Sequence, residues 1–210
     1  MSNFETKSCL IKIKGLNDLI VHSVEHSLNP RNQWSKELSA LAKKKGTNKT
    51  IDVIEKMAYL ETKRSLWYAD DEYTTLEIPP RVLRAVIEAG ARKVKAGPQV
   101  REGLMVTECI DFSYPFEDVP VDDLCQRSWN DPKGGLQFET PVVVKRSKVM
   151  RVRARFQRPW SATFRVEFFS DLLDEVHLEE WLKIAGIRLG IGDWRPEKSG
   201  IFGRFDFEVQ

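Results

Sequence analysis

The sequence predicts an α+β fold, and two observations carry that prediction. The first is the end of the chain, where a strand is predicted at 142–156 and apolar and polar side chains alternate from 149 onward and again along 160–168, as they do in paired strands. A helical segment follows through Ala185, then a glycine-rich loop and a closing strand at 205–209. The second observation is the helical spacing of apolar residues in three earlier segments, 33–45, 50–60 and 80–95. Helices and strands in separate runs are typical of α+β proteins.

Shorter elements are predicted in the first half of the chain. Residues 8–14 are rich in β-branched side chains, which indicates a strand. Residues 65–78 have the pattern of a hairpin around a polar turn, and 105–112 that of another strand. In the helix predicted at 50–60, the inward-facing residues are expected to be Ile51, Ile54, Ala58 and Leu60.

The domain organisation is expected to be simple. The sequence has no internal repeat, no low-complexity segment and no linker-like composition. We therefore expect a single domain over 1–210, with an inserted helical and hairpin lobe at 33–95. Residues 116–141 are expected to form a long loop, and loops of that length inside a compact domain are usually functional or mobile.

The composition is that of a folded protein, because 41% of the 210 residues are apolar and 30% are charged. No apolar run is long enough for a membrane span, and the N-terminus lacks the apolar core of a signal peptide. Three widely spaced cysteines, Cys9, Cys109 and Cys125, fit neither a disulfide framework nor a zinc site. We expect a cytoplasmic protein that needs no membrane, metal or cofactor.

Charge is unevenly distributed along the chain, although the formal net charge is only +2. Residues 145–158 contain seven cationic residues and no acid, whereas 117–123 contain four acids and no base. A basic face and an acidic face suit a polyanionic partner, or head-to-tail contacts between copies of the chain.

Three arginines are the strongest candidates for an anion-binding surface. Because side chains alternate along a strand, Arg151, Arg153 and Arg155 share one face, opposite an apolar face that includes Met150 and Phe156. A row of like charges must be paired with acids, solvated or matched to phosphates. Aromatic residues that would stack unpaired bases are also present, namely Trp160, Trp194, Phe202 and Phe205.

The loop at 190–205 is a second candidate anion site. Its glycines, Gly190, Gly192, Gly200 and Gly203, are expected to let the backbone take positive φ and approach a ligand closely. Unpaired backbone N–H groups, with Arg195, Lys198 and Arg204 beside them, would suit a phosphate. The alternative is a surface loop whose glycines serve only tight turns.

Two histidines are the only candidates for catalysis. His22 and His26 are four residues apart, a spacing that would place both on one face of a helix for acid–base chemistry. A histidine in a loop is more often structural, so no residue is assigned a catalytic role and an enzymatic function stays open.

The two ends of the chain resemble a known superfamily. Residues 11–23, Ile-Lys-Ile-Lys-Gly-Leu-Asn-Asp-Leu-Ile-Val-His-Ser, resemble the first strand and glycine turn of the repeat-associated mysterious proteins of CRISPR systems. The four loop glycines are similar to the C-terminal glycine-rich loop of that superfamily. The ending also resembles a group of bacteriophage proteins that share G-I-G-D-W-R-P-E-K-x-G-x-F-G-R-F. The resemblance implies a ferredoxin-like core, similar to the RNA-recognition motif, that binds single-stranded nucleic acid and polymerises along it.

The expected function is therefore non-catalytic, oligomeric binding of RNA or single-stranded DNA, in the host cytoplasm if a phage encodes the protein. Two alternatives remain open. One is a metal-independent endoribonuclease of the same superfamily that uses His22 or His26. The other is a phage inhibitor whose basic row docks on an acidic host protein.

Overall fold

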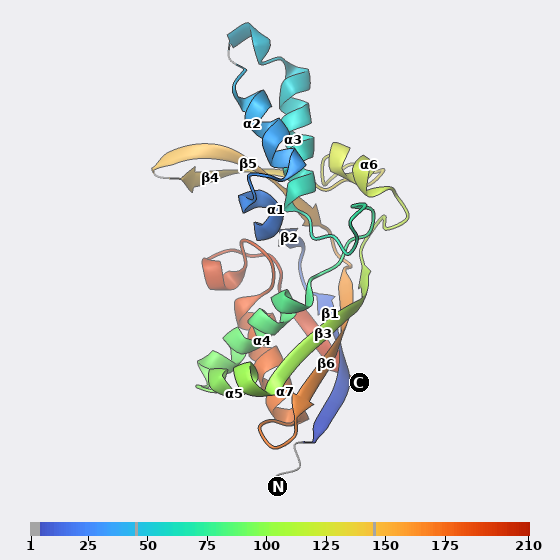
Figure 1. The fold of residues 1–210 in the computed structure, drawn as a ribbon, viewed down its shortest axis with the longest axis vertical. Coiled ribbons are helices and arrows are strands. Elements are labelled where there is room, and N and C mark those ends of the chain that lie inside the picture. Colours follow the sequence, from blue (N-terminus) through green and yellow to red (C-terminus); the bar gives the residue numbers. More distant parts are fainter. Residues whose placement is uncertain (1–4, 45, 145) are drawn as a thin grey trace. The chain divides into compact units, whose positions relative to one another are not determined.

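The computed structural model describes residues 5–44, 46–144 and 146–210, which fold into two compact units (Figure 1). The first unit comprises Met1–Leu19, Glu77–Pro115 and Gln157–Gln210, and the second comprises Ile20–Leu76 and Phe116–Phe156. Each unit has its own antiparallel sheet and its own helices, which confirms the α+β class.

The first unit is built on a four-stranded sheet. Its strands lie in the order β3 (Leu104–Ser113), β6 (Ser161–Phe169), β1 (Thr6–Gly15) and β7 (Phe205–Val209), and each neighbouring pair is antiparallel. Strands β1 and β3 are therefore parallel to each other with β6 between them, and β6 and β7 are parallel with β1 between them. Each of these two parallel pairs is joined by a helical connection in the chain.

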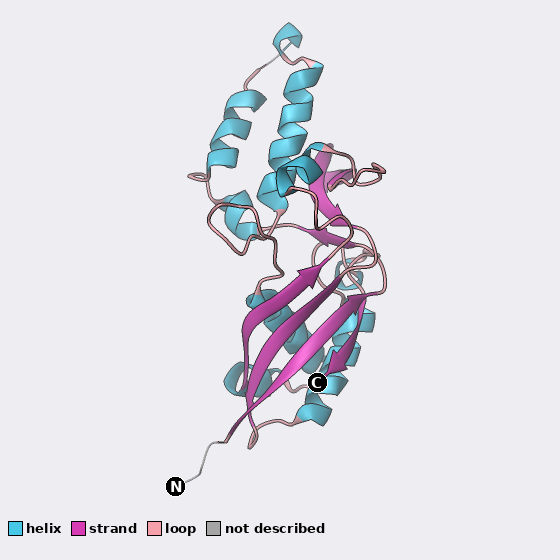
Figure 2. Cartoon of the chain, turned by 90° about the vertical axis from the view of Figure 1, so that its right-hand side faces the viewer, coloured by secondary structure: helices cyan, strands magenta, loops and turns pink. Residues whose placement is uncertain are grey.

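The two main helices of this unit, α4 (Pro80–Lys93) and α7 (Glu175–Ile184), pack together on one face of the sheet (Figure 2). Gly90 permits this contact, because a Cβ there would lie 2.3 Å from the backbone oxygen of Trp181. The unit's other helical segments are α5 (Gly97–Gly103), the π-helical turn η2 (Ala185–Leu189) and the 3₁₀ turn η3 (Pro196–Lys198).

The second unit has a three-stranded sheet in the order β2 (Leu19–Val21), β5 (Ser147–Phe156) and β4 (Gln137–Val144). Its helical segments are α1 (Val24–Leu28), α2 (Gln33–Ala42), η1 (Gly46–Asn48), α3 (Ile51–Ser65) and α6 (Val121–Gln126). Helices α2 and α3 bury a shared apolar cluster of Trp34, Leu38, Leu41, Val53 and Leu60.

Helix α3 also satisfies the backbone of β5. The Val152 N–H donates to the Glu61 carboxylate at 3.0 Å, and the Ala154 N–H donates to the Ser65 hydroxyl at 2.9 Å. Both N–H groups point away from β4. The two helix side chains therefore accept hydrogen bonds that the carbonyl groups of a neighbouring strand would otherwise accept. This contact fixes the face of α3 that carries Glu61 against the strand that carries the arginines.

Most predicted elements are present, with some differences in extent. The strand predicted at 142–156 is two strands, since β4 ends at Val144 and β5 begins at Ser147. The hairpin predicted at 65–78 is reduced to one isolated bridge, in which Tyr68 pairs with Leu76. Residues 116–141 are more regular than a loop, because they contain α6 and the start of β4.

The lobe predicted at 33–95 differs from the second unit in three places. The second unit begins at Ile20, helix α4 belongs to the first unit, and 116–156 return to complete the second. Met150, expected on a buried face, is 59% exposed, so only the C-terminal half of β5 lies in a core. No helix in the described part of the chain is long and apolar enough to cross a membrane.

Candidate functional site

The predicted row of arginines is divided in the structure. Arg151 and Arg153 line a pocket of about 240 Å³ in the second unit. Arg64 and Glu61 from α3 line the same pocket. We call it the arginine pocket and define it by His22, Glu61, Arg64, Val142, Arg151, Val152 and Arg153.

Local structure explains how these charges meet. Glu61 and Arg64 are three residues apart on α3 and so share one face of the helix. Arg151 and Arg153 are two residues apart on β5 and so share one face of the strand. Apart from His22, the charged side chains that line the pocket are three guanidinium groups and one carboxylate.

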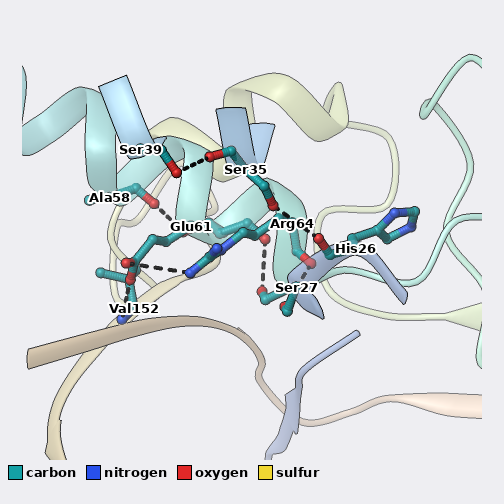
Figure 3. Close-up of polar contacts among 10 residues, drawn as sticks. His26, Ser27, Ser35, Ser39, Ala58, Glu61, Arg64 and Val152 are labelled. Atoms are coloured by element: carbon teal, nitrogen blue, oxygen red, sulfur yellow. Dashed lines mark hydrogen bonds and ion pairs between the residues drawn. The ribbon is translucent and has the colours of Figure 1, made fainter. Parts of the chain in front are cut away.

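Arg64 lies between a positive and a negative neighbour. Burial lowers the pKa of its guanidinium, and the charge of Arg151 lowers that pKa further, whereas Glu61 opposes both effects. The Arg64 Nη2 atom lies 3.8 Å from the Glu61 carboxylate, and that carboxylate also accepts the Val152 N–H (Figure 3). One carboxylate therefore serves both a helix cation and a strand backbone group.

Arg155 has a different environment from the other two arginines of the row. Its guanidinium carbon lies 3.5 Å from the centroid of the Trp129 ring and 4.8 Å from that of Phe138. These are cation–π contacts that fix the side chain against the segment between α6 and β4. The arginine pocket therefore includes Arg151, Arg153 and the helix residue Arg64, which the sequence did not single out, but not Arg155.

The two histidines are not brought together. His22 precedes Ser23, the N-cap of α1, and lines the arginine pocket. His26 lies within α1 among aromatic rings, with ring centroids 5.5 Å from Trp34 and 5.7 Å from Tyr68. The helical spacing that suggested a shared face does not apply, because the helix begins between them.

The glycine-rich loop lies in the first unit and bonds to its own surroundings. The Gly200 N–H donates to the Arg195 carbonyl at 3.0 Å, and the Gly203 N–H donates to the Asp18 carbonyl at 2.8 Å. The Gly190 N–H donates to the Ala185 carbonyl at 2.8 Å. The expectation of unpaired N–H groups at these three glycines is therefore wrong.

Steric contacts explain why glycine is needed in this loop. A Cβ at Gly200 would lie 1.7 Å from the Trp194 oxygen, and one at Gly203 would lie 1.8 Å from the Ile191 oxygen. Gly190, Gly192 and Gly203 also have positive φ, at 73°, 79° and 71°. The loop thus uses its glycines for close internal packing of its own backbone.

The cations of the loop are mostly engaged within the first unit. Arg195 donates to the Gly192 carbonyl and forms a 2.6 Å ion pair with Glu197. The Arg204 Nε donates to the Ile187 carbonyl at 3.1 Å. Lys198 is exposed, so it is the loop cation whose charged group faces solvent most openly.

The aromatic residues expected to stack on bases are mostly buried. Trp194 is 37% exposed, whereas Trp160, Phe202 and Phe205 are buried. Trp160 donates its indole N–H to the Asn17 carbonyl at 2.7 Å, and the Asn17 side chain bonds to Ile201 and to the Arg204 backbone. The N-terminal turn and the glycine-rich loop are therefore joined as one structural unit, with Trp194 on its surface.

The remaining histidine, cysteine and acidic side chains do not form a candidate site among the described residues. Among the described residues, no cluster of three or more histidine, cysteine or acidic side chains could hold a metal ion. Burial raises the pKa of the Cys9 and Cys125 thiols, and that of Cys109 to about 11, so these thiols are poor nucleophiles at neutral pH. In the acidic stretch, Asp122 forms a 2.6 Å ion pair with Lys63.

No protein-family model and no curated protein matches this chain, so its function is argued from the arginine pocket.

Proposed function

We propose that this protein binds the phosphate backbone of a single-stranded nucleic acid, RNA or DNA, at the arginine pocket. The observation that supports the proposal is the convergence of Arg64, Arg151 and Arg153 on one hollow with a single carboxylate. Holding like charges together is unfavourable in the free protein, and a bound phosphate would relieve that repulsion. Planar guanidinium groups also match the geometry of phosphate oxygens.

The surroundings of the pocket are consistent with a longer polyanion. Arg146 and Lys148 are exposed where the β4–β5 hairpin turns, a few residues before Arg151. Alternation places Lys148 on the strand face opposite Arg151, so these two cations would meet phosphates that pass around the end of the hairpin, outside the pocket. We therefore propose a backbone-directed contact that carries little base preference by itself.

We also propose that the first unit is a ferredoxin-like core. Its elements follow the order β1, α4, β3, β6, α7 and β7, and each parallel strand pair is split by an antiparallel strand. This is the β-α-β-β-α-β arrangement of ferredoxin-like folds. It supports the resemblance of the two chain ends to the CRISPR-associated superfamily and to the phage proteins, with the oligomeric assembly and phage role that the resemblance implies.

The sheet face of the first unit is a weaker candidate for nucleic acid. Its strands carry exposed cross-strand ion pairs, Arg165 with Glu108 at 2.6 Å and Lys14 with Glu208. Stacking platforms for bases need aromatic side chains at such positions. The proposal therefore places the nucleic acid on the second unit.

The first prediction tests the arginine pocket directly. Arg151→Gln should weaken binding of a single-stranded oligonucleotide by about tenfold at low salt, because one charged hydrogen bond to phosphate is lost. The slope of log affinity against log salt should shrink by about 0.7, the value for one phosphate contact on a single strand. Fluorescence anisotropy titrations at several salt concentrations measure both quantities.

Arg101→Gln is the matched control, since Arg101 is an exposed arginine on α5 of the first unit. It should change neither the affinity nor the slope by a comparable amount. If Arg151→Gln binds as the wild type does, with an unaltered slope, the arginine pocket does not bind phosphate. The inhibitor that docks on an acidic protein then becomes the better hypothesis.

A second candidate function is a metal-independent endoribonuclease, which is favoured by one observation: His22 lines the arginine pocket. There it would accept the proton of a 2′-hydroxyl as that oxygen attacks the adjoining phosphorus, while the arginines stabilise the added negative charge. The P–O5′ bond would break, giving a 2′,3′-cyclic phosphate and a 5′-hydroxyl whose oxygen takes a proton from water. We expect the protein to leave labelled RNA intact over hours in chelator, as a binder would. Cleavage that His22→Ala abolishes and His26→Ala retains would instead establish the enzyme.

A further inference from the structure

A second hollow adjoins the arginine pocket across one turn of α3. Its volume is about 360 Å³, and Glu61 and Arg64 line both hollows. The remaining lining residues come from α1, α2, α3 and the segment after α1. We call this hollow the serine groove and define it by Ser27, Leu28, Pro30, Ser35, Leu38, Ser39, Ala42, Met57, Glu61 and Arg64.

Helical periodicity assembles the groove. Ser35, Ser39 and Ala42 follow each other at spacings of four and three residues, so they lie along one face of α2. Met57 lies four residues before Glu61 on α3 and continues the opposite wall. The groove thus combines apolar side chains with serine hydroxyl groups, within one compact unit of the chain.

The hydroxyl groups already donate to backbone carbonyls (Figure 3). Ser39 donates to the Ser35 carbonyl at 2.8 Å, and Ser35 donates to the His26 carbonyl at 3.2 Å. Ser27 donates to the Arg64 carbonyl at 3.5 Å. Each hydroxyl has one proton and two lone pairs, so what these serines can still offer is acceptors.

We propose that the serine groove holds a nucleobase that carries an exocyclic amino group, while the neighbouring phosphate lies in the arginine pocket. The shared wall of Glu61 and Arg64 places a ring site directly beside an anion site, which is the arrangement of base and phosphate in a nucleotide. The apolar side chains of the groove suit the faces of a planar ring, and the serine lone pairs accept an amino N–H. This inference rests on the proposed function and adds base preference to it.

The experiment compares ligands and variants in pairs. Wild-type protein should bind oligo(C) about three- to tenfold more tightly than oligo(U), because cytosine has an amino donor at position 4 where uracil has a carbonyl acceptor, which the serine lone pairs cannot bind. Ser35→Ala combined with Ser39→Ala should abolish that difference. Ala42→Phe should fill the groove and weaken oligo(C) binding by about tenfold, while affinity for inorganic polyphosphate and the salt slope stay unchanged.

Ala40→Phe is the matched control, since Ala40 is exposed on the same helix and does not line the groove. It should bind oligo(C) as the wild type does. Equal wild-type affinities for oligo(C) and oligo(U), or an Ala42→Phe variant that keeps its oligo(C) affinity, overturns the base site and leaves phosphate binding intact. Failure of the proposed function differs from this, because polyphosphate and both oligonucleotides would then bind no better to the wild type than to Arg151→Gln.

Discussion

Gly203→Val is expected to destabilise the protein by about 4 kcal/mol, through two separable effects. Gly203 has φ of 71°, a region that a β-branched residue adopts only with strain. A Cβ there would also lie 1.8 Å from the Ile191 oxygen, so the backbone must move. The movement would break the bond from the Gly203 N–H to the Asp18 carbonyl and release the glycine-rich loop. Urea unfolding followed by circular dichroism measures the change.

Two other glycines serve as controls that separate the effects. Gly46 has φ of 58° and open space around its Cβ position, so Gly46→Ala isolates the conformational strain at about 1 kcal/mol. Gly200 has an ordinary φ but only 1.7 Å to the Trp194 oxygen, so Gly200→Ala isolates the steric clash at about 2 kcal/mol. If Gly203→Val and Gly46→Ala are equally mild, the loop is loosely packed and its glycines regain a role at a ligand.

The glycine-rich loop also shows what the sequence could predict and what it could not. Gly190, Gly192 and Gly203 have the positive φ expected of them, which few other residues tolerate, whereas Gly200 does not. Whether a glycine clears space for a ligand or for its own chain depends on what lies opposite. At Gly203 the group opposite is the Ile191 carbonyl oxygen. The Gly203 N–H donates to the carbonyl of Asp18, a residue far away in the sequence.

Helix α3 illustrates the same limit for a core. It begins where predicted but runs on to Ser65, beyond the predicted end at Leu60. Of the residues expected to face inward, Ala58 and Leu60 are buried, whereas Ile51 and Ile54 are 65% and 45% exposed. The helix packs against α2 and against β5, so its buried residues do not form a single stripe, and a pattern read as one stripe assigns only some of them correctly.

Only the strand residues of the arginine pocket could be predicted from the sequence. Alternation along β5 correctly placed Arg151 and Arg153 on one face, because strand geometry is local. Arg64 and Glu61 belong to a helix rich in charges, and no local signal distinguishes them from solvated neighbours. Their role depends on the long-range contact between Glu61 and the Val152 N–H.

Glu61→Gln is expected to tighten oligonucleotide binding without a loss of stability, whereas Glu61→Ala is expected to destabilise the protein. In Glu61→Gln, the amide oxygen still accepts the Val152 N–H, so stability should change little, while loss of the negative charge should tighten oligonucleotide binding by about tenfold. In Glu61→Ala, the Val152 N–H loses its acceptor, which should cost about 1–3 kcal/mol of stability. Anisotropy titrations and urea unfolding measure the two effects separately.

Glu55→Gln is the matched control, because Glu55 is exposed on the same helix and does not line the arginine pocket. It removes the same charge from α3, so a long-range effect of net charge would appear equally in both variants. A tenfold gain confined to Glu61→Gln requires that the phosphate approach this carboxylate, inside the pocket. An unchanged or weaker affinity for Glu61→Gln would instead place any bound phosphate further along β5, where Arg146 and Lys148 are exposed, because there the Glu61 charge would no longer oppose it.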